Sequence, residues 1–145
     1  MQRQMVVVAA ALLGQGTQID RLSRCLTVAS LVGAVSVAFL VGRSGLPIIL
    51  LIGAAALTGL AELWFSVRVA IDARLFQSLS VEDDGPDWTA LDAALTRLGL
   101  SPAAKAGRPS RLRIAGALRL LRYQAAALAV QFAFVFAGAA ACVAR

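Results

Sequence analysis

Three long stretches of the sequence contain no charged residue. They cover residues 25–42 (18 residues), 44–61 (18 residues) and 123–144 (22 residues), and the apolar character of the second continues past Glu62 to Val67. A helix needs about 20 apolar residues to cross a hydrocarbon core about 30 Å thick. The helices of a small soluble bundle would each need a polar face, and these stretches have none. The pattern therefore predicts an all-α integral membrane protein with three transmembrane helices.

The residues between the first two stretches predict a helical hairpin. Two glycines and a proline lie within Gly42–Pro47 (GRSGLP), which favours a tight turn between antiparallel helices. We expect the first transmembrane helix at 25–42 and the second at 46–79. The second pattern has no helix breaker before Gly85, so this helix should extend beyond the bilayer into the cytoplasm.

The chain before the first span, residues 1–24, is predicted to be an interfacial helix or a flexible arm. Its apolar run, Met5–Leu13, is nine residues long and too short to span a bilayer. Arg3 precedes this run, as in a signal peptide, but Gly14–Gln18 follows it instead of a small-residue cleavage site. Cleavage is therefore the second interpretation of this segment.

Residues 80–108 are the most polar stretch and are predicted to be a cytoplasmic loop with one short amphipathic helix. Asp87 is a suitable N-cap for a helix over 88–98, and Gly99 would end it. The chain then continues as a single helix over 109–143, which combines a basic entry with the third span.

Lysine and arginine are distributed unevenly across the predicted loops. Three precede the first span and nine lie between the second and third, whereas the first turn and the C-terminal tail hold one each. Cytoplasmic loops retain Lys and Arg, so we expect the N-terminus and residues 72–122 in the cytoplasm and the C-terminus outside. Thirteen Arg against one Lys, with abundant Ala and Leu, fit a bacterial inner-membrane protein. The same bias explains the net charge of +6.

Composition removes several classes of chemistry. Apolar residues make up 59% of the 145 residues, the mean hydropathy is +0.78, and there is no histidine, which is the commonest general base and metal ligand. Cys25 and Cys142 would lie at opposite ends of the membrane, too far apart for a disulfide. The sequence contains no nucleophile with a base at motif spacing, no phosphate loop and no metal-ligand motif. We therefore expect a protein that is not an enzyme and binds no cofactor or metal.

Glu62 is the single acidic residue inside an apolar run. An ionisable residue within a span is a functional-site hypothesis by default. Arg119 and Arg122 enter the membrane at a similar level on the third helix. We predict an intramembrane ion pair between Glu62 and these arginines that joins spans two and three. Contact with a partner subunit or lipid headgroup, and a role in transport, remain the alternatives.

Two features of the third span predict how it packs. Small residues spaced by four allow helix backbones to approach closely in lipid. Such a stripe is formed by Ala125, Ala129, Ala133 and Ala137. Gln131 lies in the middle of the same span, where an amide requires an interhelical hydrogen bond. We therefore predict helix packing through this stripe and through Gln131, with contact to a substrate as the alternative for Gln131.

The short helix 88–98 carries a one-sided apolar stripe. Its members are Trp88, Leu91, Leu95 and Leu98. The stripe must lie on the membrane, on the extension of the second span or in the groove of a partner. We predict that it forms a partner-docking face, with packing on the same chain or on lipid as the alternative.

A basic face on the third helix predicts contact with the membrane surface. Arg108, Arg111, Arg119 and Arg122 fall within an arc of about 80°. Anionic lipid headgroups would attract these cations, and an acidic partner is the alternative. A nucleic-acid surface would interleave aromatic side chains, and only Tyr123 is near, so no nucleic-acid partner is expected.

Three helices alone leave much of their apolar surface uncovered, so we expect the bilayer and other membrane subunits, or further copies of the chain, as partners. The sequence favours a non-catalytic subunit that acts as a scaffold, anchor or assembly partner in a larger inner-membrane complex. The alternative is a small homo-oligomeric transporter or channel that uses Glu62.

Overall fold

The computed structural model describes residues 2–81, 87–99 and 107–144. Within these ranges every regular element is a helix, as the hydrophobic pattern predicts. The elements are α1 (Gln2–Gly14), α2 (Gly16–Val41), the short 3-10 helix η1 (Gly42–Gly45), α3 (Leu46–Val81), α4 (Trp88–Arg97) and α5 (Ser110–Val143). The acidic residues 82–84 and Lys105 of the predicted loop lie outside the described residues.

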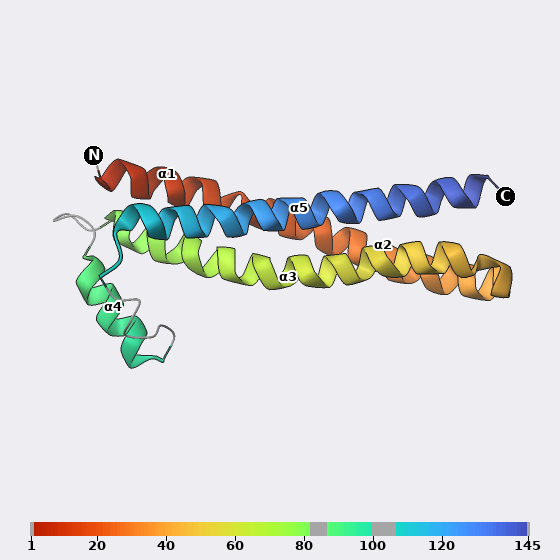
Figure 1. Ribbon diagram of the computed structural model, residues 1–145, viewed down its shortest axis with the longest axis horizontal. Helices are drawn as coiled ribbons and strands as arrows, with labels where there is room; N and C mark the ends of the chain where they lie inside the picture. Colours follow the sequence, from red (N-terminus) through yellow and green to blue (C-terminus); the bar gives the residue numbers. More distant parts are fainter. Residues whose placement is uncertain (1, 82–86, 100–106, 145) are drawn as a thin grey trace.

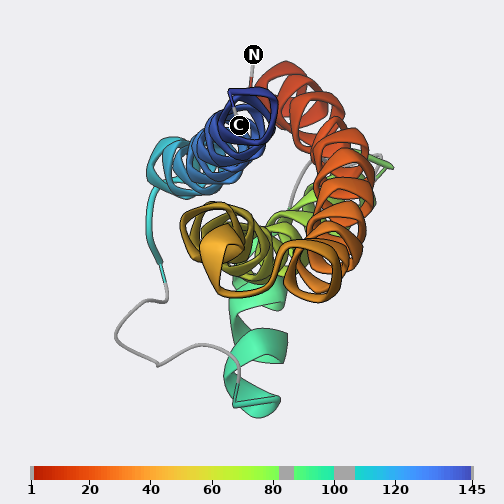
Figure 2. The ribbon, with the colours of Figure 1, turned by 90° about the vertical axis from the view of Figure 1, so that its right-hand side faces the viewer.

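The long helices lie side by side in a bundle of three rods (Figure 1). Helices α3 and α5 form two of them, and α1 followed by α2 forms the third. One end of the bundle, called the α4 end below, holds the N-terminus and α4, and the other, the η1 end, holds the turn and the C-terminus. Viewed from the η1 end, the three rods enclose a common axis and α4 extends away from it (Figure 2).

The first rod begins much earlier than the span expected at 25–42. Only Gln15 separates α1 from α2, and α1 packs on α3 and α5 instead of forming a free arm. Val6, Ala9 and Leu13 are its buried residues, and their spacing places them on one face of the helix. A nine-residue apolar run is too short to span a bilayer, but it is long enough to cover the ends of two neighbouring helices.

By length and composition, three helical stretches of the described residues can cross a membrane: Arg3–Val41, Leu46–Ser80 and Ser110–Val143. With 36 residues, α3 is about 54 Å long at 1.5 Å per residue. Since a hydrocarbon core is about 30 Å thick, a helix of this length extends well beyond one.

Buried residues recur every seven positions along the rods. Helix α5 buries Ser110, Ala117, Gln124, Gln131 and Gly138. Helix α2 buries Gly16, Ser23 and Ser30. Helix α3 buries Ile48, Ala55, Glu62, Val69 and Phe76 at this spacing, and Ala56, Ser66 and Leu79 in addition. Because a straight helix drifts by only about 20° over seven residues, this repeat keeps one narrow face of each rod inside the bundle, as in coiled coils.

The two halves of the bundle bury different kinds of side chain. At the α4 end, the core is an apolar cluster. It consists of Val6, Leu13, Val69, Phe76, Leu79 and Ala117. Toward the η1 end, the buried positions of α2 and α5 are small or polar, and large apolar side chains such as Phe39 and Leu40 are 86% and 85% exposed. This inverted polarity, with polar side chains inside and large apolar side chains outside, is the reverse of that in a water-soluble bundle.

Helix α4 is a separate short element. The side chain of Asp87 caps it by accepting hydrogen bonds from the backbone N–H groups of Thr89 (3.0 Å) and Ala90 (2.9 Å). The helix ends at Arg97, and Gly99 follows with a φ of 68°, a backbone conformation that glycine adopts without strain.

Candidate functional site: a buried polar seam

One hydrogen-bonded cluster joins all three rods at the middle of the bundle. The Gln124 Nε2 group of α5 donates to Glu62 Oε1 of α3 (2.8 Å) and to the Gly16 carbonyl of α2 (2.9 Å). Glu62 and Gln124 are both 0% exposed. Glycine is required at position 16, because a Cβ there would lie 2.8 Å from Val69 Cγ1 and 3.0 Å from Gln124 Oε1.

A second cluster lies two helical turns closer to the η1 end. Ser23 Oγ of α2 donates to Gln131 Oε1 of α5 (2.8 Å), and Gln131 Nε2 donates to Thr27 Oγ1 (2.9 Å) and to the Ser23 carbonyl (3.3 Å). Gly59 of α3 faces this cluster, and its missing side chain lets α3 approach Thr27 and Gln131. We call the two clusters together the polar seam: Gly16, Ser23, Thr27, Gly59, Glu62, Gln124 and Gln131.

The polar seam retains unused acceptor atoms. Glu62 Oε2 and Gln124 Oε1 are buried and have no hydrogen-bond partner among the residues that the structure describes. A carboxylate oxygen accepts hydrogen bonds or a proton, and an amide oxygen accepts only. Among the described residues, no group of three or more His, Cys, Asp or Glu side chains could hold a metal ion. The chemistry available in the seam is therefore hydrogen bonding and proton binding.

The predicted ion pair between Glu62 and the arginines of α5 is not formed. Arg119 and Arg122 are exposed, and Glu62 bonds to Gln124 instead. Ion pairs do form between Asp20 and Arg24 and between Asp92 and Arg113. The seven-residue repeat gives the reason: at 100° per residue, Arg122 projects about 160° away from the buried Gln124, and so faces outward.

Within one chain, the structure places Gln131 in hydrogen bonds between helices and leaves the predicted alanine stripe exposed. Gln131 makes three interhelical hydrogen bonds. The stripe is exposed at Ala125, Ala129, Ala133 and Ala137. A four-residue spacing drifts by about 40° per step, twice the drift of the seven-residue repeat, so it cannot follow the buried face.

The apolar stripe of α4 packs on its own chain, which is the alternative that the sequence left open. Trp88, Leu91 and Leu95 are partly buried. The Trp88 ring lies edge-on to Phe76 of α3 with ring centroids 6.0 Å apart, and the Arg113 guanidinium of α5 lies 5.4 Å from its centroid. Of the predicted docking face, only Leu98 is largely exposed, at 70%.

An ion pair holds the same side of α4 to the bundle. Asp92 Oδ2 accepts hydrogen bonds from Arg113 Nη2 (2.7 Å) and from the Gly107 N–H (2.8 Å). The hydrogen bond from Arg113, followed by that from Gly107, lowers the pKa of the Asp92 carboxyl below its ordinary value of 3.8. Sequence reasoning did not identify this pair, because residues 92 and 113 are far apart and share no periodic pattern.

This lowered pKa predicts that α4 docking is sensitive to acid. A depressed folded-state pKa contributes stability that is complete above the ordinary value of 3.8 and is lost as the pH falls through the folded-state value. In a Trp64→Phe background, where Trp88 is the only remaining tryptophan, its emission should therefore shift toward that of a solvated indole below about pH 4. An Asp92→Asn variant should lack this transition, and an identical acid transition in the variant would contradict the assignment.

No protein-family model, no curated protein and no solved structure matches this chain. The observation that bears most directly on function is therefore a feature of the chain itself: polar residues are buried and large apolar residues are exposed toward the η1 end.

Proposed function

We propose that this chain is an integral membrane protein that serves as a non-catalytic subunit, acting as a scaffold, anchor or assembly partner in a larger inner-membrane complex. The observation that carries the proposal is the inverted polarity toward the η1 end. Glu62 and Gln124 at the middle of the bundle and Gln131 closer to the η1 end are fully buried, while large apolar side chains face outward. In water, large apolar side chains would be buried and polar side chains would face outward. A hydrocarbon solvent favours the observed arrangement, because interhelical hydrogen bonds and small residues hold membrane helices together.

Aromatic and basic side chains at one level of the bundle support an inner membrane boundary there. Trp64 is 67% exposed, and the Arg68 guanidinium lies 5.9 Å from its ring centroid. The neighbouring Phe65 contacts the exposed Tyr123 of α5, with ring centroids 6.0 Å apart. Trp and Tyr concentrate at membrane interfaces, and Arg is retained on the cytoplasmic side. The apolar core of the α4 end would then lie in the cytoplasm, where water drives its burial.

The uncovered surface favours a subunit over a protein that works alone. In the most apolar 18-residue windows of the three long stretches, 6%, 28% and 11% of the residues are buried. The exposed alanine stripe on α5 would let a helix of a partner chain approach closely. The stripe would then serve in helix packing, as predicted, but between two chains and not within one. Glu62 has a structural role in this interpretation, because its carboxyl is enclosed and bonded to Gln124.

One observation favours the alternative of a small homo-oligomeric transporter or channel. Glu62 Oε2, which has no hydrogen-bond partner among the described residues, lies inside a predicted span, where ionisable groups commonly serve ion or proton pathways. A transport role would require that a second conformation opens the seam to water.

Purification in mild detergent followed by mass spectrometry distinguishes the two functions. A subunit should co-purify with unlike membrane chains. Substituting Ala129 and Ala133 together by leucine should reduce that co-purification, whereas Val130→Leu, which adds bulk beside the stripe, should not. A chain that purifies alone as a homo-oligomer, and whose vesicles show a proton or cation flux that Glu62→Gln abolishes, would overturn the subunit proposal.

A further inference from the structure

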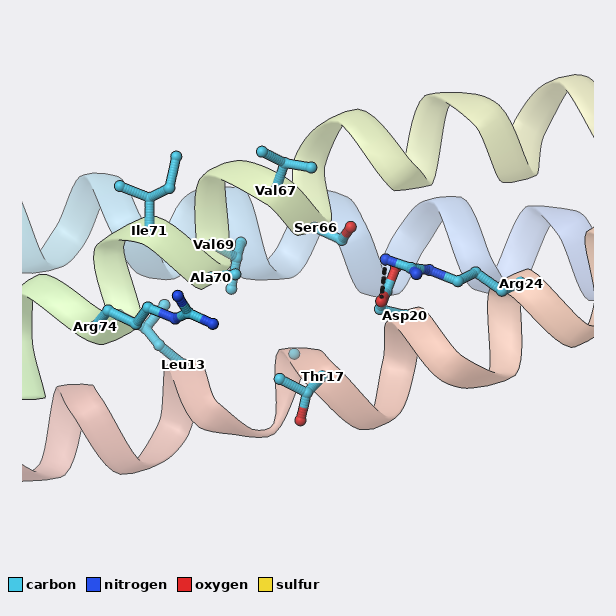
Figure 3. Close-up of a pocket in the computed structure, with 11 residues that line it drawn as sticks. Leu13, Thr17, Asp20, Arg24, Ser66, Val67, Val69, Ala70, Ile71 and Arg74 are labelled. Atoms are coloured by element: carbon cyan, nitrogen blue, oxygen red, sulfur yellow. Dashed lines mark hydrogen bonds and ion pairs between the residues drawn. The ribbon is translucent and has the colours of Figure 1, made fainter. Parts of the chain in front are cut away.

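A groove separates the α1–α2 junction from α3 at the level of the proposed inner membrane boundary (Figure 3). It encloses a volume of about 280 Å³. Its polar lining comes from both sides: Thr17, Asp20 and Arg24 from α2, and Ser66 and Arg74 from α3. Figure 3 shows Arg74 extended toward one end of the groove and the Asp20–Arg24 pair at the other.

The groove has an excess of positive charge. Asp20 is neutralised by Arg24, because Arg24 Nη2 lies 2.8 Å from Asp20 Oδ2 and Arg24 Nε donates to Asp20 Oδ1 at 3.0 Å. No acceptor within the described residues forms a hydrogen bond or ion pair with the Arg74 guanidinium. Within the described residues, Arg74 is therefore an uncompensated cation at the end of the groove opposite Arg24.

One hydroxyl group faces the groove and can accept a hydrogen bond there, that of Ser66. Ser66 Oγ donates its hydrogen to the Leu63 carbonyl (2.9 Å) and keeps lone pairs for a donor from outside. The Thr17 hydroxyl donates to the Gly14 carbonyl (2.9 Å) and points away from α3 (Figure 3). A complementary ligand therefore carries an anionic oxygen for Arg74 and a hydroxyl donor for Ser66.

The groove opens onto an apolar surface. Val67 and Ile71 line it from α3 and are exposed, and Leu22 is exposed on the neighbouring α2. If the chain is a membrane protein as proposed, the hydrocarbon of the inner leaflet begins at this level. A ligand in the groove could then keep its charged group at Arg74 while its apolar part remains in the bilayer.

We propose that this groove binds the headgroup of an anionic phospholipid that bears free hydroxyls, of the phosphatidylglycerol type. Its phosphate pairs with Arg74, and a glycerol hydroxyl donates to Ser66. The inference rests on the proposed membrane location, but it assigns a site on α2 and α3 that is distinct from the basic face predicted on the third helix.

Lipid binding to the purified full-length chain in detergent tests this assignment. Bound phosphatidylglycerol and phosphatidylcholine are compared by native mass spectrometry. Arg74→Gln should weaken phosphatidylglycerol binding about fivefold, the factor that corresponds to one cation near an anionic surface. Asp20→Asn should strengthen it by a similar factor, because Arg24 is freed. Arg97→Gln, which removes an exposed cation on α4, is the matched control and should leave binding unchanged.

Opposite effects of the two groove variants cannot arise from a general loss of folding. Equal binding of phosphatidylcholine, or equal effects of Arg74→Gln and Arg97→Gln, would overturn the site. Displacement of the lipid by millimolar inorganic phosphate would mean that the groove selects a soluble anion, which also contradicts the proposal. Resistance of the chain to alkaline extraction from membranes is measured in parallel. An extracted chain would refute the membrane location itself, whereas a retained chain without lipid selectivity would refute only this site.

Discussion

Replacing Gly59 by valine should separate α3 from α2 and disrupt the polar seam. A Cβ at this position would overlap Thr27 Oγ1 and lie 2.7 Å from Gln131 Nε2. Neither group can move freely, because Thr27 Oγ1 donates to the Ser23 carbonyl (2.8 Å) and Gln131 bonds to α2 at both ends of its amide. Overpacking costs about 1–3 kcal/mol. The hydrogen bonds lost with it add about 0.6–2 kcal/mol each.

We therefore expect the free energy of unfolding of Gly59→Val to fall by about 3 kcal/mol or more. Unfolding by a denaturing detergent in bicelles measures this quantity. Gly53→Val provides a control on the same helix, because a Cβ at Gly53 meets no atom within 4 Å. Equal destabilisation by the two substitutions would show that helix propensity, and not the close approach at Gly59, determines the effect.

Replacing Gln124 by leucine is the second substitution expected to have a large effect. It removes the two hydrogen bonds by which Gln124 joins α5 to α2 and α3, and it leaves the Glu62 carboxyl and the Gly16 carbonyl buried without these donors. An unsatisfied buried polar group costs about 1–3 kcal/mol, so we expect a loss of about 3 kcal/mol in the same unfolding experiment. Adding Glu62→Met should recover part of this loss, because one stranded group is then removed.

Two further variants separate this interpretation from the ion pair predicted from the sequence. Glu62→Gln keeps an acceptor oxygen for Gln124 Nε2, so its effect should stay within about 1 kcal/mol. Arg119→Gln should show no coupling to it, because Arg119 is exposed on the outer face of α5. A strong loss with Glu62→Gln that Arg119→Gln rescues would restore the ion-pair model.

The sequence predicts the long helices well, because the positions and lengths of the charge-free runs determine where they form. It fails at the packing faces, where the informative period is seven residues and the buried positions of α2 and α5 are mostly small or polar. Ser23, Gln124 and Gln131 share this period, but a search for apolar stripes passes over them. The alanine spacing of four on α5 is the more conspicuous pattern, and it lies on the exposed side. Glu62 is recognisable as unusual, yet its partner is an amide and not a cation.

The apolar run of α1 shows a second limit of the sequence. A test for membrane spans rejects Met5–Leu13 because of its length. Its actual role, covering α3 and α5 at the α4 end, depends on how far those helices extend. The same holds for α4, whose stripe faces Phe76 and Arg113 of the same chain. Tertiary contacts of this kind are set by three-dimensional proximity, which no local pattern contains.

Cysteine labelling in intact cells tests the central claim, a three-span membrane bundle with its α4 end in the cytoplasm, most directly. Cys25 and Cys142 are first replaced by serine, and single cysteines are placed at the exposed Ser44 of η1 and Ser78 of α3. A membrane-impermeant maleimide should label position 44 from outside and position 78 only after the membrane is permeabilised. Labelling of position 78 in intact cells, or recovery of the chain in the soluble fraction, would contradict this account.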